Sequence, residues 1–158
     1  MTHKLEPGDM APAFTLPTNG GGEYSIPDSD ARMVVLYFYP KDSTPGCTTE
    51  AIDFSTLKHK FDKLGVKIVG VSKDSVKRHD NFVAKQNLTI TLASDEQGDI
   101  LDKYGVWVEK KNYGRVYMGI ERSTFLIGAD GKIAHIWRKV RVKNHAQDVL
   151  DMVKTLLS

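Results

Sequence analysis

Cys47 is the one cysteine of the chain, and its surroundings indicate a reactive thiol. It lies in the segment PKDSTPGCTTE (residues 40–50), between an apolar run and a helical pattern. Pro45 suits the first position of a helix, and Thr44 suits the cap before it. Cys47 then falls in the first turn, where free backbone N–H groups and the helix dipole favour an anion. These conditions favour the thiolate, which is the nucleophilic form of cysteine.

A lone cysteine also excludes several kinds of chemistry. It cannot form an intramolecular disulfide, a Cys-x-x-Cys redox motif or a cysteine-rich zinc site, and it indicates a reducing compartment. Most free cysteines are small buried hydrophobes, so burial without reactivity is the alternative for Cys47. The Thr-Pro-Gly-Cys context between a strand and a helix favours the reactive thiol.

A buried strand before Cys47 and an amphipathic helix after it must position the thiol. Residues 33–39 form a continuous β-branched and aromatic run, typical of a strand buried on both faces. Apolar residues at helical spacing predict a helix over 45–64. At about 100° per residue, Cys47 shares the inward face of this helix with Phe54, whereas Ile52 faces outward.

The remaining pattern completes an α/β fold. Further strands are predicted at 66–71, 89–92, 123–127 and 132–137, and further helices at 75–86, 100–104 and after Asn144. A tight turn at 19–22 joins two short N-terminal strands, and Asn144 with Gln147 is predicted to cap the last helix. This order predicts a central mixed β-sheet flanked by helices on both faces, which matches the thioredoxin-like fold. We expect residues 1–158 to form a single domain.

Composition and charge disfavour other classes of function. The chain has 158 residues, and 22 Lys plus Arg against 20 Asp plus Glu leave a net charge of +2. That balance gives no whole-protein attraction to nucleic acid or to an anionic membrane. No apolar run reaches the roughly 20 residues of a bilayer span, and the first residues lack a signal-peptide pattern. We therefore expect a cytoplasmic protein with neither a nucleic-acid nor a membrane partner.

Three other groups of residues are weaker candidates for function. The histidines show no metal-ligand spacing and are expected at the surface: His3, His59, His79, His135 and His145. The basic run at 138–143 is predicted to be a solvated connection, with an acidic or nucleic-acid partner as the alternative. Residues 106–108, with Tyr113 and Tyr117, are expected to line the site or to fill the edge of the core.

The segment around Cys47 resembles the active-site signature of the peroxiredoxin family, Pro40-x-x-x-Thr44-x-x-Cys47. Residues 39–42 and 44–48 are similar to the bacterioferritin-comigratory, or Q-type, branch of that family. The resemblance covers nearly the whole chain, through residues 8–16, 103–107 and 119–127.

This resemblance implies a thiol-dependent peroxidase for hydrogen peroxide and organic hydroperoxides. Cys47 would attack the terminal peroxide oxygen, Thr44 and Arg122 would hold the substrate, and Pro40 would shield the thiolate from bulk water. The product would be a cysteine sulfenic acid, and no metal or cofactor is implied. Q-type relatives are usually monomers, so a monomer is expected. The alternative is a thioredoxin-fold redox sensor or binding module with little turnover.

Position 52 departs from the family pattern. Many Q-type members carry a second cysteine five residues after the first, and here that position is Ile52. The resemblance therefore implies that an external thiol reduces the sulfenic acid at Cys47. Thioredoxin, glutathione with a glutaredoxin, or another small thiol would serve.

Overall fold

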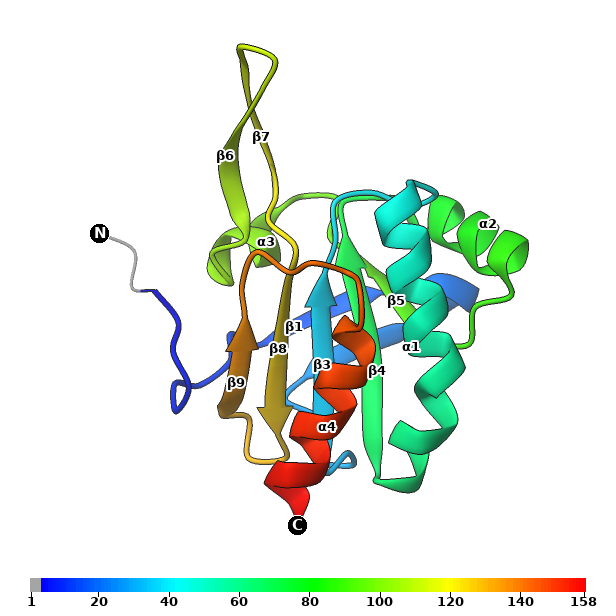
Figure 1. Cartoon of the computed structure of the whole chain (residues 1–158), viewed down its shortest axis with the longest axis vertical. Helices are drawn as coiled ribbons and strands as arrows, with labels where there is room; N and C mark the ends of the chain where they lie inside the picture. The colour runs from blue at the N-terminus through cyan, green and yellow to red at the C-terminus, as the bar shows by residue number, and fades with distance from the viewer. Residues whose placement is uncertain (1–3) are drawn as a thin grey trace.

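A five-stranded sheet forms the centre of the computed structural model, which describes residues 4–158 (Figure 1). Its strands are β3 (Met33–Phe38), β4 (Val66–Ser72), β5 (Thr91–Ser94), β8 (Ser123–Gly128) and β9 (Ile133–Trp137). They lie in the order β5-β4-β3-β8-β9. β3 and β5 run parallel to β4, whereas β8 runs antiparallel to β3 and β9. The prediction of a central mixed sheet is confirmed.

Each face of this sheet is covered by an apolar layer. Helices α1 (Pro45–Lys63) and α4 (His145–Leu157) cover one face, and α2 (Val76–Gln86) lies along the β5 edge and contributes Phe82 to that layer. The other face is covered by the short helix α3 (Asp99–Lys103) and the hairpin of β1 (Phe14–Pro17) and β2 (Glu23–Ile26). The 3-10 turn η1 (Asn19–Gly21) joins β1 to β2, as the sequence predicts. Within residues 4–158, no helix combines the length and apolarity that a membrane crossing requires.

The elements that flank Cys47 match their predicted ranges closely, because the patterns there are strong. All six residues of β3 are buried, and α1 begins at Pro45 and ends one residue before the predicted boundary. The fifth strand is displaced from the predicted 89–92 to Thr91–Ser94. The apolar residues Leu88 and Ile90 are buried in the connection after α2, so their burial reflects packing and not strand pairing.

A hairpin of β6 (Trp107–Asn112) and β7 (Arg115–Ile120) projects from the body of the molecule and was not predicted (Figure 1). Tyr113 at its turn is 98% exposed and Tyr117 is 47% exposed, so the expectation that they fill the edge of the core is wrong. Both faces of the hairpin are largely exposed to solvent. Its sequence therefore lacks the alternation of polar and apolar residues by which a half-buried strand is predicted.

The start of α4 also differs from the prediction. Asn144 precedes the helix in a left-handed conformation (φ 61°) and makes no side-chain capping hydrogen bond. Gln147 instead donates a hydrogen bond to Asp151 one turn later, so the predicted cap does not form. The basic run 138–143 does connect β9 to α4, as expected.

Candidate active site

The loop from β3 into α1 places Cys47 in the first turn of the helix. Thr44 holds the extended backbone of an N-cap residue (φ −88°, ψ 155°), and its carbonyl accepts a hydrogen bond from Thr48 N at 2.8 Å. Cys47 is 2% exposed and packs in the apolar layer with Phe54. Ile52 is 38% exposed, so the predicted inward and outward faces of this helix are confirmed.

Arg122, which lies between β7 and β8, joins the thiol to a buried carboxylate. Its Nη2 atom donates to Cys47 Sγ at 3.4 Å, and its Nη1 atom donates to Glu50 Oε1 at 2.6 Å. A Cβ atom at Gly46 would lie 3.2 Å from Arg122 Nη2, so a larger residue there would press on the guanidinium. Two parts of the chain that are far apart in sequence thus meet at one guanidinium.

Glu50 is the site residue that the sequence analysis missed. It lies within the segment that carries Cys47, one helical turn later, and is 1% exposed. Burial raises the pKa of Glu50 to about 7, although the Arg122 guanidinium acts in the opposite direction. A glutamate three residues after a candidate nucleophile on a predicted inward face is the signal that could have found it.

The titration of Glu50 should make the stability of the protein depend on pH. Its pKa of about 7 lies above the ordinary 4.5, so the folded state binds this proton more tightly than the unfolded state does. Glu50 should therefore contribute a fall of about 3 kcal/mol in the free energy of unfolding as the pH rises through that interval. Burial lowers the pKa of His145 to about 4, so His145 acts in the opposite direction over part of the same range. The Glu50 contribution is measured by urea denaturation at pH 5 and pH 8, as the difference between the parent protein and a Glu50→Gln variant.

A Glu50→Gln variant removes the titration and should lose most of that decline. The matched control is Glu96→Gln, because Glu96 is exposed and its substitution should leave the pH dependence intact. An equal decline in the Glu50→Gln protein would show that another group is responsible.

Thr44 and Pro40 lie on either side of the loop that precedes the helix. The Thr44 side chain does not cap α1; its Oγ1 atom donates to the Lys41 carbonyl at 2.8 Å. A hydroxyl that donates its proton in this way keeps lone pairs that can accept a hydrogen bond from a substrate O–H. Pro40 lies two residues after the end of β3 and is half-buried.

Two buried polar atoms in the described residues have no hydrogen-bond partner, Tyr37 Oη and Glu50 Oε2. Tyr37 belongs to the apolar layer that contains Cys47, and Glu50 contacts the same arginine as the thiol. An unsatisfied buried polar group costs about 1–3 kcal/mol of stability. The surroundings of Cys47 therefore retain polarity that packing alone would not favour.

The expectation that all histidines lie at the surface is wrong for two of them. His79 is 0% exposed and His145 is 4% exposed, because each has a hydrogen-bond partner in the interior. His145 Nε2 lies 2.8 Å from Thr124 Oγ1, and burial lowers the pKa of His145 to about 4. His3 lies outside the described residues. Among residues 4–158, no three His, Cys, Asp or Glu side chains gather as a metal site would require.

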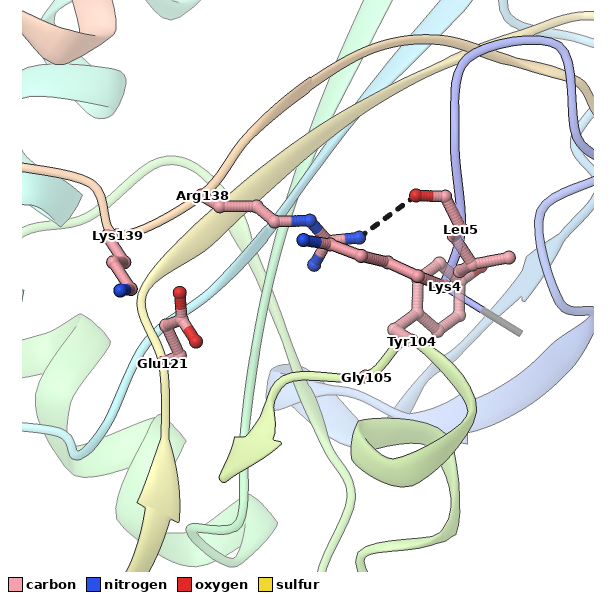
Figure 2. Close-up of a pocket in the computed structure, with 7 residues that line it drawn as sticks. All are labelled: Lys4, Leu5, Tyr104, Gly105, Glu121, Arg138 and Lys139. Atoms are coloured by element: carbon pink, nitrogen blue, oxygen red, sulfur yellow. Dashed lines mark hydrogen bonds between the residues drawn. The ribbon is translucent and has the colours of Figure 1, made fainter. Parts of the chain in front are cut away.

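A separate pocket of about 410 Å³ lies beside the connection between β9 and α4 (Figure 2). Its lining residues are Lys4, Leu5, Tyr104, Gly105, Glu121, Arg138 and Lys139. Arg138 donates to the Leu5 carbonyl at 3.1 Å across this pocket. The lining includes neither Cys47 nor Arg122, and Tyr104 and Leu5 belong to the apolar layer on the opposite face of the sheet from Cys47.

The fold is a mixed β-sheet flanked by helices, and a guanidinium contacts a buried thiol at the start of one helix. This combination defines a thioredoxin-like thiol redox protein. Residues 7–136 match the model of the AhpC/TSA family, and the chain belongs to that family. It is 49% identical over 146 residues to peroxiredoxin Bcp of Xanthomonas campestris, covering 91% of each chain. It is 44% identical over 152 residues to peroxiredoxin Bcp of Bacillus subtilis, covering 96% of this chain and 97% of the relative.

Solved structures agree with this assignment. A cysteine-to-serine mutant of Xylella fastidiosa PrxQ superposes with a TM-score of 0.92 at 39% identity, covering 100% of both chains. The bacterioferritin comigratory protein of X. campestris superposes with a TM-score of 0.87 at 46% identity, covering 92% of both. The thioredoxin-like fold and the resemblance to Q-type peroxiredoxins are confirmed, and the chain is a thiol-dependent peroxidase.

Proposed function

We propose that Cys47 is the peroxidatic nucleophile and that Thr44, Arg122 and Pro40 complete its site. The observation that carries this proposal is the Arg122 guanidinium, which donates to Cys47 Sγ at 3.4 Å inside a buried site. A cation at this distance stabilises a thiolate. The first turn of α1 adds the field of the helix N-terminus.

The proposed reaction is an attack by the Cys47 thiolate on the terminal oxygen of a peroxide. The S–O bond forms as the O–O bond breaks, sulfur is oxidised to a sulfenic acid, and the peroxide is reduced to water or an alcohol. The Thr44 hydroxyl accepts a hydrogen bond from the peroxide O–H, and Arg122 donates to the oxygen that gains charge. Pro40 limits the access of water to the thiolate.

External thiols complete the proposed cycle, because the chain has a single cysteine. One thiol displaces water from the sulfenic acid to form a mixed disulfide, and a second thiol releases Cys47. Thioredoxin, or glutathione with a glutaredoxin, would supply this chemistry. The lone thiol also supports action in the reducing cytoplasm, and the resemblance to Q-type relatives supports a monomer.

Turnover separates this proposal from a redox sensor of the same fold. The purified protein with excess dithiothreitol should consume many equivalents of hydrogen peroxide. Without the reductant, one equivalent of peroxide should add one oxygen atom to the intact mass, and excess peroxide should add a second. Consumption of a single equivalent despite excess dithiothreitol would favour the sensor.

An Ile52→Cys variant should form a disulfide with Cys47 after one equivalent of peroxide. Both residues lie in α1, with Cys47 2% exposed and Ile52 38% exposed, so an intact helix keeps the two side chains apart. The disulfide therefore requires the first turns to unwind. Intact-mass analysis should show the loss of two hydrogen atoms in the variant and the gain of oxygen in the parent protein.

The matched control is Thr56→Cys, because Thr56 is also exposed on α1 but lies more than two helical turns from Cys47. It should give no intramolecular disulfide. If Ile52→Cys behaves like this control while Cys47 still oxidises, the start of α1 is too rigid to unwind, and only external thiols can resolve the sulfenic acid.

A further inference from the structure

A buried hydrogen-bond network lies behind the loop that leads into α1. We call it the loop anchor, and its members are Tyr39, Asp42, Ser72, Asp74, His79 and Ser94. All six are less than 9% exposed, and they come from the loop itself, β4, α2, β5 and the segments that directly follow the strands. The loop anchor is distinct from the Cys47–Arg122–Glu50 contacts, and the proposed reaction does not use it.

Asp42 is the centre of the loop anchor. Its Oδ1 atom accepts a hydrogen bond from the Tyr39 hydroxyl, and its Oδ2 atom lies 2.7 Å from His79 Nδ1. Its backbone N–H donates to Asp74 Oδ2 at 2.8 Å. With 3% of its surface exposed, Asp42 has little access to water, so these three bonds decide where the loop lies.

The partners of His79 fix one proton between that residue and Asp42. His79 Nε2 lies 3.0 Å from the Ala93 carbonyl oxygen, which can only accept, so Nε2 carries a proton. Nδ1 faces the carboxylate at 2.7 Å, and a bond there needs one further proton on either Nδ1 or Oδ2. The His79–Asp42 pair therefore carries no net charge, so its burial requires no further counter-ion.

Asp74 fastens the other side of the loop anchor. Its Oδ2 atom accepts from Ser72 Oγ at 2.7 Å, and Arg78 Nε lies 3.3 Å from its Oδ1 atom. Ser94 Oγ donates to the Asp74 carbonyl at 2.6 Å. The end of β4 and the start of α2 thus hold the Asp74 carboxylate, and the end of β5 holds the Asp74 backbone. That carboxylate in turn holds the backbone of Asp42.

The loop anchor acts on the site through the residues next to Asp42. Lys41 supplies the carbonyl that accepts the Thr44 hydroxyl at 2.8 Å. Ser43 has a left-handed backbone (φ 64°), a conformation that costs energy for a non-glycine residue and persists only when its neighbours hold it. We propose that Asp42 and His79 are positioning residues, which keep the Thr44 hydroxyl where a peroxide bound beside Cys47 and Arg122 can use it. This inference rests on the proposed function of Cys47 and Thr44.

Two rates measured on the same thiol test this inference. Oxidation of Cys47 by hydrogen peroxide depends on the placement of Thr44, whereas alkylation by iodoacetamide needs the thiolate but no peroxide site. Asp42→Ala should lower the oxidation rate constant on the order of tenfold to a hundredfold, and should change the alkylation rate much less. The matched control is Asp62→Ala, because Asp62 is an exposed partner of Lys58 and should change neither rate.

The conservative variant Asp42→Asn distinguishes positioning from loss of the buried charge. An asparagine can accept from Tyr39 and donate to a neutral His79, so it should restore most of the oxidation rate that alanine removes. If Asp42→Ala does not fold, Tyr39→Phe takes its place, because it removes one hydrogen bond from Asp42 and keeps the ring. It should lower oxidation about threefold with little effect on alkylation.

The positioning role would be overturned if Asp42→Ala, or Tyr39→Phe in its place, lowered oxidation and alkylation equally. Normal oxidation in that variant would also overturn it. Failure of asparagine to exceed alanine would also overturn it. Failure of the proposed function itself looks different, because the unaltered protein would then show no fast oxidation of Cys47 by peroxide.

Discussion

The Cys47→Ser protein is expected to consume no peroxide beyond the background of the reductant. A serine hydroxyl remains protonated near neutral pH, so it is a weak nucleophile. Peroxide does not oxidise its oxygen as it oxidises a thiolate to a sulfenic acid. The substitution replaces one small buried atom by another, and Arg122 retains its 2.6 Å bond to Glu50. The free energy of unfolding should therefore change by no more than about 1–2 kcal/mol.

Thr48→Ser is the matched control, since Thr48 lies in the same turn and its backbone N–H bonds to Thr44. It should retain peroxidase activity. Peroxide consumption is followed directly and folding is followed by thermal melting. Reductant-dependent turnover by a correctly folded Cys47→Ser protein would remove Cys47 from the mechanism.

The sequence predicted the thiol and the elements around it because their patterns are local. A continuous apolar strand, a proline at the start of a helix and a stripe of apolar residues determine where α1 begins and which face it buries. Cys47 and Ile52 lie on the faces that a helical period predicts. The contact of Cys47 with Arg122 came instead from resemblance, because no local pattern joins residues that are 75 positions apart.

The residues that the sequence analysis misplaced or missed depend on tertiary partners. His79 is buried only because Asp42 and the Ala93 carbonyl meet its two ring nitrogens. Glu50 is buried only because Arg122 reaches it from between β7 and β8. Charged residues and histidines are expected at the surface unless a partner offsets the cost of desolvation. The local sequence does not show which distant residue is that partner.

Removal of Arg122 should reduce the rate of Cys47 oxidation on the order of 10²–10³-fold, the usual cost of losing a donor to a transition state. Stability should suffer too, because Arg122→Ala leaves the Glu50 carboxylate buried without its cation, a change that costs about 3–5 kcal/mol. The guanidinium lowers the pKa of Glu50, so its loss should raise that pKa further above about 7. Glu50 then takes up a proton, and the loss of stability should be smaller at pH 6 than at pH 8.

The double variant Arg122→Ala with Glu50→Gln separates these two consequences. Glutamine is uncharged, so the double variant has no buried carboxylate without a cation. It should therefore be more stable than Arg122→Ala at pH 8. Its oxidation rate should remain as low as that of the single variant, because the donor to the peroxide is still missing. Urea denaturation and the rate of sulfenic acid formation measure the two effects on the same samples. Recovery of the rate together with the stability would mean that Arg122 supports the fold around Cys47 and does not act on the peroxide.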